Sequence, residues 1–289
     1  MIAVKRRKRS GSIVVRKMSM TQGWMIGLIA VLTFLTVLGF ATIETKGIDL
    51  VQATLDTLRY FGIMITTPRG VASHFGVTEG GALGIIMEGV SLVGTTLSLA
   101  FLTTIIGGLV ALFLSFFAAR NLANQHISNA LKGFVAMIRA VPTVLWVLIF
   151  AIGAGMGSVA AVIGMSFHTI GYLLKSYSET FEEIDAGTIE ALKASGATWW
   201  QIIFQAVLPS SLTALVSWTF IRFEINFAVA VAMGAAAGAG GIGFQLFMAA
   251  GYFFDIREIG FVTYLIVIVA LIMEVIATRL KNHYHILKD

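Results

Sequence analysis

The sequence predicts an all-α protein, a polytopic transmembrane bundle of about six helices. Two properties of its composition point to this class. Hydrophobic residues make up 57% of the 289 residues and charged residues 12%, against roughly 25% charged in an ordinary soluble domain. Mean hydropathy is +0.89, and the apolar residues gather in runs of the roughly 20 residues that a helix needs to cross a bilayer.

The first segment, residues 1–23, is predicted to be a basic cytoplasmic tail. A net charge of +5 would suit nucleic acid, but a basic cluster beside an apolar run fixes membrane orientation and contacts anionic lipid. We therefore expect the lipid bilayer, and no nucleic acid, as its partner. The chain has no cysteine, which excludes disulfides and thiolate metal sites. The basic residues of the tail are Lys5, Arg6, Arg7, Lys8, Arg9, Arg16 and Lys17.

Six apolar runs follow, and each predicts a membrane span. The first is longer than the roughly 7–15 residues of a signal-peptide core, and no small-x-small cleavage site follows it, so we expect it to be retained. The second is longer than a bilayer needs, which predicts tilting or projection beyond the membrane. The spans lie near residues 24–43, 88–117, 133–153, 157–175, 210–235 and 259–279.

The longest external connection is expected at residues 44–87. Within it, residues 48–66 place Val51, Leu55 and Leu58 at helical spacing, which predicts a helix lying at the membrane interface. Thr67-Pro68-Arg69-Gly70 then ends that pattern.

The distribution of Lys and Arg predicts the orientation. With the N-terminus inside, the inner segments hold fourteen of these residues and the outer segments four, which places both termini in the cytoplasm. The chain is thereby divided into the tail 1–23, a transmembrane domain 24–280 with a cytoplasmic loop at about 176–208, and a second tail 281–289.

A polar motif lies in that loop: Glu190-Ala191-Leu192-Lys193-Ala194-Ser195-Gly196, followed by Leu208-Pro209. It resembles the loop with which permease subunits of binding-protein-dependent ABC importers engage their ATPase, which reads Glu-Ala-Ala, three residues, Gly, nine residues, Ile, one residue, Leu-Pro. Five residues match this family pattern and two depart from it, Leu192 for an alanine and Ala206 for the isoleucine. The resemblance implies the type I ABC importer permease architecture. The matching residues, implied to couple to the ATPase, are Glu190, Ala191, Gly196, Leu208 and Pro209.

The loop itself is expected to fold as two short helices. Thr188 is predicted to cap the first, with Glu190 in its opening turn, where the helix dipole favours a carboxylate. Gly196 should end that helix and Thr198 begin the next, which carries two tryptophans at the membrane interface. The alternative is an interfacial hairpin that binds nothing.

A second motif narrows the resemblance. Phe220-Ile221-Arg222-Phe223-Glu224-Ile225-Asn226, together with Arg139-Ala140-Val141-Pro142 and the run Gly238–Gly243, resembles the permeases of phosphonate importers. In that group a second arginine follows the asparagine by two residues, where this chain has Ala228. The resemblance implies transport of phosphonate or a related oxyanion such as phosphite or phosphate.

Arg222, Glu224 and Asn226 are therefore candidates for the substrate pathway. A charge facing lipid costs about 2.5–3.5 kcal/mol, so both charged residues should face the bundle interior, a partner or water. Being two residues apart, they should not pair with each other. Arg222 either lines an anion pathway or holds helices together, and both readings stay open. Arg139 is expected near the cytoplasmic end of its span, as an interfacial anchor.

The glycine-rich run should break the fifth span near the outer face. Its residues Gly238, Gly240, Gly241 and Gly243 are either a flexible external gate or a site of close helix packing, and the sequence favours neither.

Catalytic motifs are missing from the sequence. Gly164-x-Ser166-x-His168 differs from a nucleophile elbow, which has glycine at the last position. The histidines lack zinc-type spacing, and there is no Walker A sequence. We expect a non-catalytic subunit with no metal or cofactor of its own, whose partner ATPase subunits bind ATP and Mg.

The resemblance as a whole implies a permease in the bacterial cytoplasmic (inner) membrane, with a second copy as a homodimer, two ATPase subunits and an external substrate-binding protein. One alternative is an ABC permease for a different small solute. Another is a self-powered secondary transporter, which usually shows internal repeats or broken midplane helices, and the sequence shows neither. A membrane-embedded enzyme would need a nucleophile–base or metal constellation, which is not found.

Overall fold

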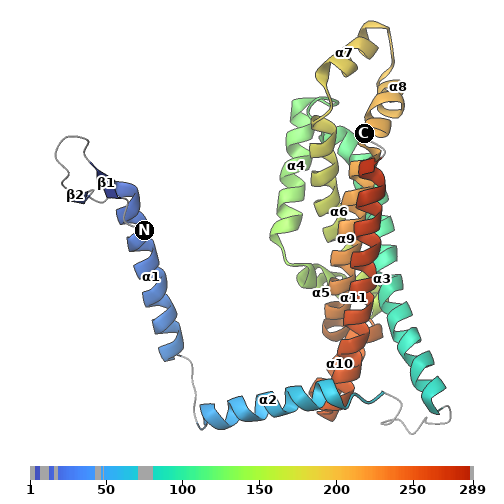
Figure 1. The fold of residues 1–289 in the computed structure, drawn as a ribbon. Coiled ribbons are helices and arrows are strands. Elements are labelled where there is room, and N and C mark those ends of the chain that lie inside the picture. Colours follow the sequence, from blue (N-terminus) through green and yellow to red (C-terminus); the bar gives the residue numbers. More distant parts are fainter. Residues whose placement is uncertain are drawn as a thin grey trace. The chain divides into compact units, whose positions relative to one another are not determined.

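The computed structural model describes residues 4–6, 13–15, 19–42, 47, 49–70 and 81–286. Much of the basic tail, the end of the C-terminal tail and residues 71–80 of the external connection lie outside these ranges. The described residues are predominantly helical (Figure 1), which confirms the all-α class. Five helices are long and apolar enough to span a membrane, or six if one bent pair counts as a span.

The N-terminal unit comprises residues 1–57. Strands β1 (Val4–Arg6) and β2 (Ile13–Val15) pair antiparallel. Helix α1 (Met20–Thr42) corresponds to the first predicted span. Ser19 and Gln22 exchange hydrogen bonds across its first turn, in the manner of a capping box.

The larger unit begins at residue 58, within helix α2 (Leu50–Thr66). The predicted helix 48–66 is thus confirmed, and it ends before Pro68 as expected. Its last turns dock on α11 (Ile256–Ile286): the Tyr264 hydroxyl donates to the Ile65 carbonyl at 2.7 Å. A Cβ on Gly260 would lie 2.2 Å from the Met64 carbonyl oxygen, so only glycine permits this approach.

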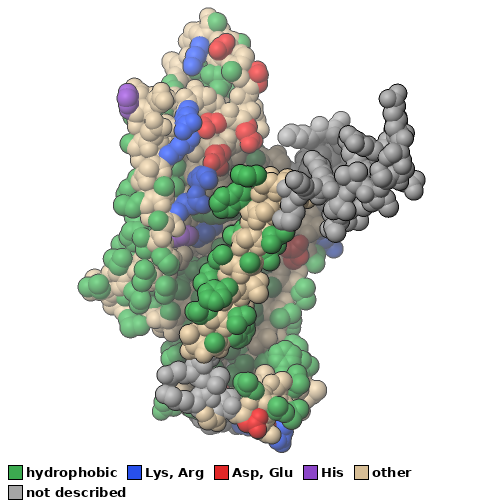
Figure 2. All heavy atoms as spheres, turned by 90° about the vertical axis from the view of Figure 1, so that its left-hand side faces the viewer, with side chains coloured by type: hydrophobic (Ala, Val, Ile, Leu, Met, Phe, Trp, Pro, Cys, Tyr) green, Lys and Arg blue, Asp and Glu red, His purple; other side chains and the backbone are tan. Residues whose placement is uncertain are grey.

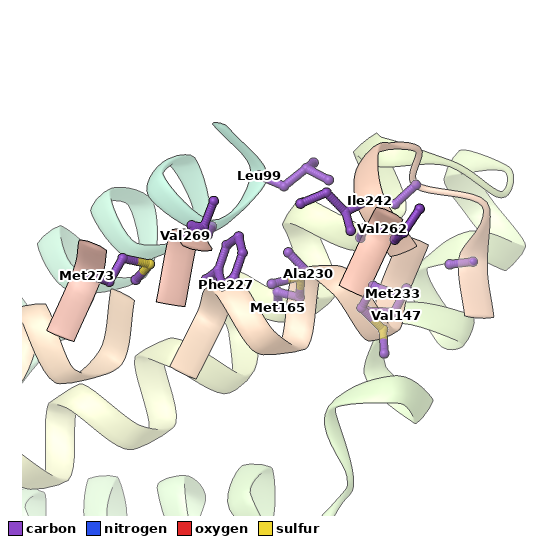
Figure 3. Packing of buried hydrophobic residues seen from close by; sticks show 14 residues of the cluster. Leu99, Val147, Met165, Phe227, Ala230, Met233, Ile242, Val262, Val269 and Met273 are labelled. Carbon is purple, nitrogen blue, oxygen red and sulfur yellow. The ribbon is translucent and has the colours of Figure 1, made fainter. Parts of the chain in front are cut away.

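Long helices form the bundle: α3 (Gly81–Ala118), α6 (Ser158–Glu182) and α9 (Leu208–Ala237), with α11 beside them (Figure 1). At 1.5 Å per residue α3 is about 57 Å long, so the prediction of an over-long second span is confirmed. Side chains from these helices and α5 interdigitate in one apolar core, including Leu99, Met165, Phe227 and Val269 (Figure 3).

The third predicted span, 133–153, is not a single straight helix. It consists of α4 (Gln125–Ala140) and α5 (Thr143–Ala154), which meet at 90°. Pro142 has no N–H to donate and disfavours helical backbone at Val141, whose dihedrals are φ −91 and ψ 125. This chain therefore contains a broken helix. From the sequence we expected no broken helix and argued against a secondary transporter on that ground, which was wrong.

Helix α5 is held against α6 at Gly164. A Cβ there would lie 2.6 Å from the backbone of Val147. The indole of Trp146 closes the bend by donating to the Ile138 carbonyl at 3.0 Å. These contacts fix the bend as part of the packed bundle.

The break expected after the fifth span is confirmed. Helix α9 ends at Ala237, and the chain turns through Gly238 and Gly240, with φ values of 64 and 84. Helix α10 (Gly241–Met248) and a π-helical segment η3 (Ala249–Phe253) follow before α11. In Figure 1 α10 lies at the end of the bundle opposite α7.

Candidate functional site

Two short helices stand at one end of the bundle, where the coupling loop was predicted (Figure 1). They are α7 (Ala186–Ala194) and α8 (Trp199–Ile202). The cap of α7 is Asp185, whose carboxylate accepts from the Thr188 N–H at 3.0 Å. The prediction that Thr188 caps this helix was wrong, because Thr188 is already inside the first turn and Glu190 lies in the second.

The end of α7 is as predicted. Gly196 has φ +83, its N–H donates to the Lys193 carbonyl at 3.0 Å, and the Ala197 N–H donates to the Leu192 carbonyl at 3.0 Å. These two bonds form a Schellman motif, which favours glycine. Thr198 then caps α8 in a capping box with Gln201.

One face of α7 carries small side chains. Gly187, Glu190, Ala191 and Ala194 are exposed and recur at helical spacing. The opposite face holds Ile189, which is 3% exposed, and the partly buried Leu192, both packed in the core beneath the loop. The departure at Leu192 thus falls on the buried face and leaves the exposed face unaltered.

The other matching positions lie beyond α8. Leu208 is partly buried and Pro209 is exposed in the first turn of α9. The π-helical segment η2 (Ile203–Val207) precedes them, and the Leu208 N–H donates to the Ile203 carbonyl. Such a π-bulge accommodates a proline that cannot donate within a continuing helix. Ala206, the other departure, is 6% exposed and packs as an apolar side chain.

The α7–α8 hairpin is attached at both ends to the turn that joins α3 and α4. The Glu182 carboxylate accepts from the Arg120 N–H and from the Lys132 ammonium, each at 2.7 Å. On the other side, the Trp199 indole donates to the Leu122 carbonyl at 2.8 Å. A force on α7 would therefore reach α3 and α4 as well as α6 and α9.

A buried polar cluster lies deeper in the bundle, around Arg222. This residue is 2% exposed. Its Nε donates to Thr169 Oγ1 at 3.2 Å, and Nη2 lies 3.3 Å from His168 Nδ1. Its guanidinium carbon is 5.2 Å from the centre of the Tyr172 ring, within cation–π range.

Asn226 extends this cluster one turn along α9. Its amide donates to Thr104 at 2.9 Å and to Thr169 at 3.1 Å, which joins α9 to α3 and α6. Glu224 is half-buried and forms no ion pair with Arg222 in the described part of the chain. The structure thus brings Arg222 and Asn226 together and leaves Glu224 apart from them.

The sequence did not reveal the partners of this cluster. Thr104 and Thr169 are threonines within apolar helices, and nothing in the local pattern distinguishes them from neighbouring threonines. A second buried pair, the Gln245 amide donating to the Glu258 carboxylate, was missed as well. The only sequence signal for it was an acidic residue at the start of the last span.

Ser166 and His168 form no dyad. Among the described residues, the buried Ser166 hydroxyl has no hydrogen-bond partner, whereas His168 contacts Arg222. Neither residue is placed for nucleophilic chemistry.

The glycine run packs tightly at two of its four candidate positions. A Cβ on Gly243 would lie 1.6 Å from the Val231 carbonyl oxygen, and one on Gly241 2.4 Å from Thr96 Oγ1. The same threonine accepts from the Ile242 N–H at 2.9 Å. Gly238 has open space around it, and the nearest atom to a Cβ on Gly240 is at 3.7 Å. Close packing accounts for Gly241 and Gly243.

Comparison with known proteins places these features in context. The family described as a binding-protein-dependent transport system inner membrane component matches residues 111–285. The chain is 32% identical over 153 residues, 53% of its length, to the phosphate-import permease protein PhnE of Mycolicibacterium smegmatis, and that match covers 29% of the relative. It is 29% identical over 190 residues to the phosphite transport system permease protein PtxC of Stutzerimonas stutzeri, covering 65% of this chain and 68% of the relative.

Among solved structures, the chain resembles a component of the inward-facing MetNI methionine ABC transporter. The TM-score is 0.60 with 25% sequence identity, and the match covers 67% of this chain and 94% of that one. The fold is that of a type I ABC importer permease.

Proposed function

The chain belongs to the family of binding-protein-dependent transport system inner membrane components, and on that premise we propose that it forms the membrane pathway of an ATP-driven importer for phosphonate or a related oxyanion such as phosphite or phosphate. Its partners would be a second copy of the chain, two ATPase subunits and an external binding protein. The chain itself would remain non-catalytic, with ATP and Mg bound by the ATPases.

The observation that carries the choice of an anion is Arg222. Its guanidinium is buried against a threonine, a histidine and a tyrosine, and within the described ranges it forms no ion pair. A buried cation without a carboxylate is expensive. Such a charge is compensated when an anion passes close to it, because it replaces part of the hydration that the anion loses. The resemblance to phosphate and phosphite permeases supports the same substrate class.

Coupling would begin at the small-residue face of α7. A face of Gly, Ala and one carboxylate admits a partner surface at close range. Movement of α7 would then be transmitted through Glu182 and Trp199 to the α3–α4 turn, and the bundle would switch between inward- and outward-open states. The glycine turn before α10 would serve as the external gate, with Gly238 and Gly240 as its mobile positions.

The test of this function is ligand-stimulated ATP hydrolysis. The permease would be purified with its ATPases, reconstituted in proteoliposomes and mixed with its binding protein. We expect phosphite, methylphosphonate or phosphate to stimulate hydrolysis several-fold and methionine to leave it at the basal rate. Stimulation by methionine alone would favour an importer of that amino acid, as in the structurally similar MetNI transporter.

The same assay separates the two roles of Arg222. If it lowers the barrier for an anion, Arg222→Gln should reduce uptake while the complex assembles and retains basal ATP hydrolysis. Failure of Arg222→Gln and Arg222→Lys to assemble would instead identify a purely structural hydrogen-bonding residue.

Orientation in the membrane is tested separately. The excess of Lys and Arg at the α7 end predicts that reporters at residues 125, 195 and 289 read cytoplasmic and that one at residue 70 reads external. Accessibility of cysteines introduced at these positions, in a chain that has none of its own, measures this directly. A residue 195 accessible only from outside would exclude contact with cytoplasmic ATPases and overturn the proposed function.

A further inference from the structure

A cavity of about 170 Å³ opens in the groove between α4 and α6. Val135 and Leu174 form its apolar floor. Its rim is charged and carries Lys132, Arg139, Lys175 and Glu179. In Figure 2, several Lys and Arg side chains lie close to Asp and Glu side chains in the upper part of the molecule.

Arg139 lies in the last turn of α4, next to the bend between α4 and α5. It packs beside Gly171 of α6, where an added Cβ would be 3.3 Å from Arg139 Cγ. Gly171 is near the middle of α6. Lys132 meets Glu182 at the α7 end of the same helix. The groove therefore leads from the α7 end to the middle of α6, with Lys132 at its start and Arg139 at its end.

The charges along the groove are unequally compensated. Lys132 is paired with Glu182 at 2.7 Å. Lys175 and Glu179 are 3.6 Å apart, and both side chains are about half exposed, so this pair is loose and weak. Arg139 is exposed and forms no ion pair in the part of the chain that the structure describes. The rim keeps an excess positive charge, centred on Arg139.

The groove also leads toward the buried cluster. His168 lies within electrostatic range of both Arg139 and Arg222, and its Nδ1 lies 3.3 Å from the Arg222 guanidinium. Arg139, His168 and Arg222 thus form a series of nitrogen-bearing side chains from the groove into the bundle.

We infer that this cavity is a binding site for a tetrahedral oxyanion, held mainly by Arg139 with Lys175 beside it. The substrate class rests on the proposed function, but the site does not depend on transport. A guanidinium binds phosphate-like oxygens in bidentate fashion, and an ammonium adds a point charge. The volume equals that of about five to six waters at ~30 Å³ each, which suits an ion of about five heavy atoms with some of its water.

Two sources can supply this ion: substrate leaving the bundle and free phosphate entering from the α7 side. If the ion is substrate leaving the bundle, the cavity is the final binding site of the transport pathway. If the ion is free phosphate from the α7 side, the cavity senses accumulated product. The chemistry of binding is the same in both.

The test is equilibrium binding of radiolabelled inorganic phosphate to the purified permease–ATPase complex in nanodiscs, without binding protein or nucleotide. We expect Arg139→Gln to weaken binding about tenfold or more, as loss of a charged hydrogen-bonding partner would. Arg139→Lys should lose less. Glu179→Gln removes a repelling carboxylate and should tighten binding. Lys193→Gln, which removes an exposed charge on α7, is the matched control and should leave binding unchanged.

Binding that is absent from the wild-type complex at millimolar phosphate, or equal in wild type and Arg139→Gln, would overturn the inference. Phosphate trapped on the α7 side of proteoliposomes distinguishes the sources. If it inhibits uptake in wild type but not in Arg139→Gln, the site senses cytoplasmic product; if uptake is unaffected although binding persists, the site holds passing substrate. A complex that imports methionine yet binds phosphate through Arg139 would refute the proposed function and support this binding site. A complex that imports an oxyanion but does not bind phosphate through Arg139 would support the proposed function and refute the binding site.

Discussion

Replacing Ala194 with tryptophan is expected to abolish transport while the bundle still assembles in the membrane. Ala194 is exposed at the C-terminal end of the small-residue face of α7, away from the buried Ile189. A bulky ring there points away from the core, so the free energy of unfolding should hardly change. It would, however, hold an ATPase surface away from α7. Uptake should fall to background, and ATP hydrolysis should become insensitive to the loaded binding protein.

The control for this variant is Thr188→Trp, which adds the same ring on a flank of the same helix, where the side chain is also exposed. It should transport at close to the normal rate. Glu190→Arg, on the small-residue face, should behave like Ala194→Trp. Gly196 is less suitable for the test, because its φ of +83 would strain any larger residue. If Ala194→Trp and Thr188→Trp both transport normally, α7 is not the docking element.

Gly243→Ala is expected to prevent folding of the α9–α10 corner. The added Cβ would lie 1.6 Å from the Val231 carbonyl oxygen, so backbone must move on one side or the other. Overpacking against side chains costs about 1–3 kcal/mol, and a backbone clash should exceed that. We expect little or no monodisperse protein after detergent extraction, measured by fluorescence-detected size-exclusion chromatography with heating.

The matched control is Gly133→Ala in α4, where, among the described residues, no atom other than the adjoining backbone of the same helix lies within 4 Å of the added Cβ. Alanine is favoured over glycine in a helix by about 0.5–1 kcal/mol, so this variant should be at least as stable as wild type. Gly238→Asn tests the proposed external gate before α10. There is open space around Gly238, and asparagine tolerates its φ of +64. A Gly243→Ala protein as stable as Gly133→Ala would show that the corner is loosely packed.

The sequence alone determined the features that depend on local chemistry. A run of about 20 apolar residues has to form a helix in a bilayer, because its backbone groups have no other partners there. The long helices α1, α3, α6, α9 and α11 were therefore predictable. So were the ends of helices at Gly196 and Gly238, since positive φ favours glycine, and the start at Thr198, since a threonine three residues before a glutamine forms a capping box.

The sequence could not decide between two residues that are both suited to the same local role, such as the N-cap of a helix. Asp185 and Thr188 are both good caps, and the choice depended on where α6 ended. Val141-Pro142 fixes where the helix breaks, but hydropathy is continuous across it, so the 90° angle between α4 and α5 could not be predicted. That angle is held by the packing of α5 on Gly164 and by the hydrogen bond of Trp146.

The tertiary structure alone decided which polar groups meet. Arg222, Thr169 and Thr104 come from three helices far apart in the sequence, and their hydrogen bonds exist only because these helices pack side by side. The bend likewise brings Arg139 beside Gly171, near the middle of α6, a contact that the sequence did not predict. Local patterns fix what each residue favours, whereas the partners of a buried charge depend on the packing of helices distant in sequence.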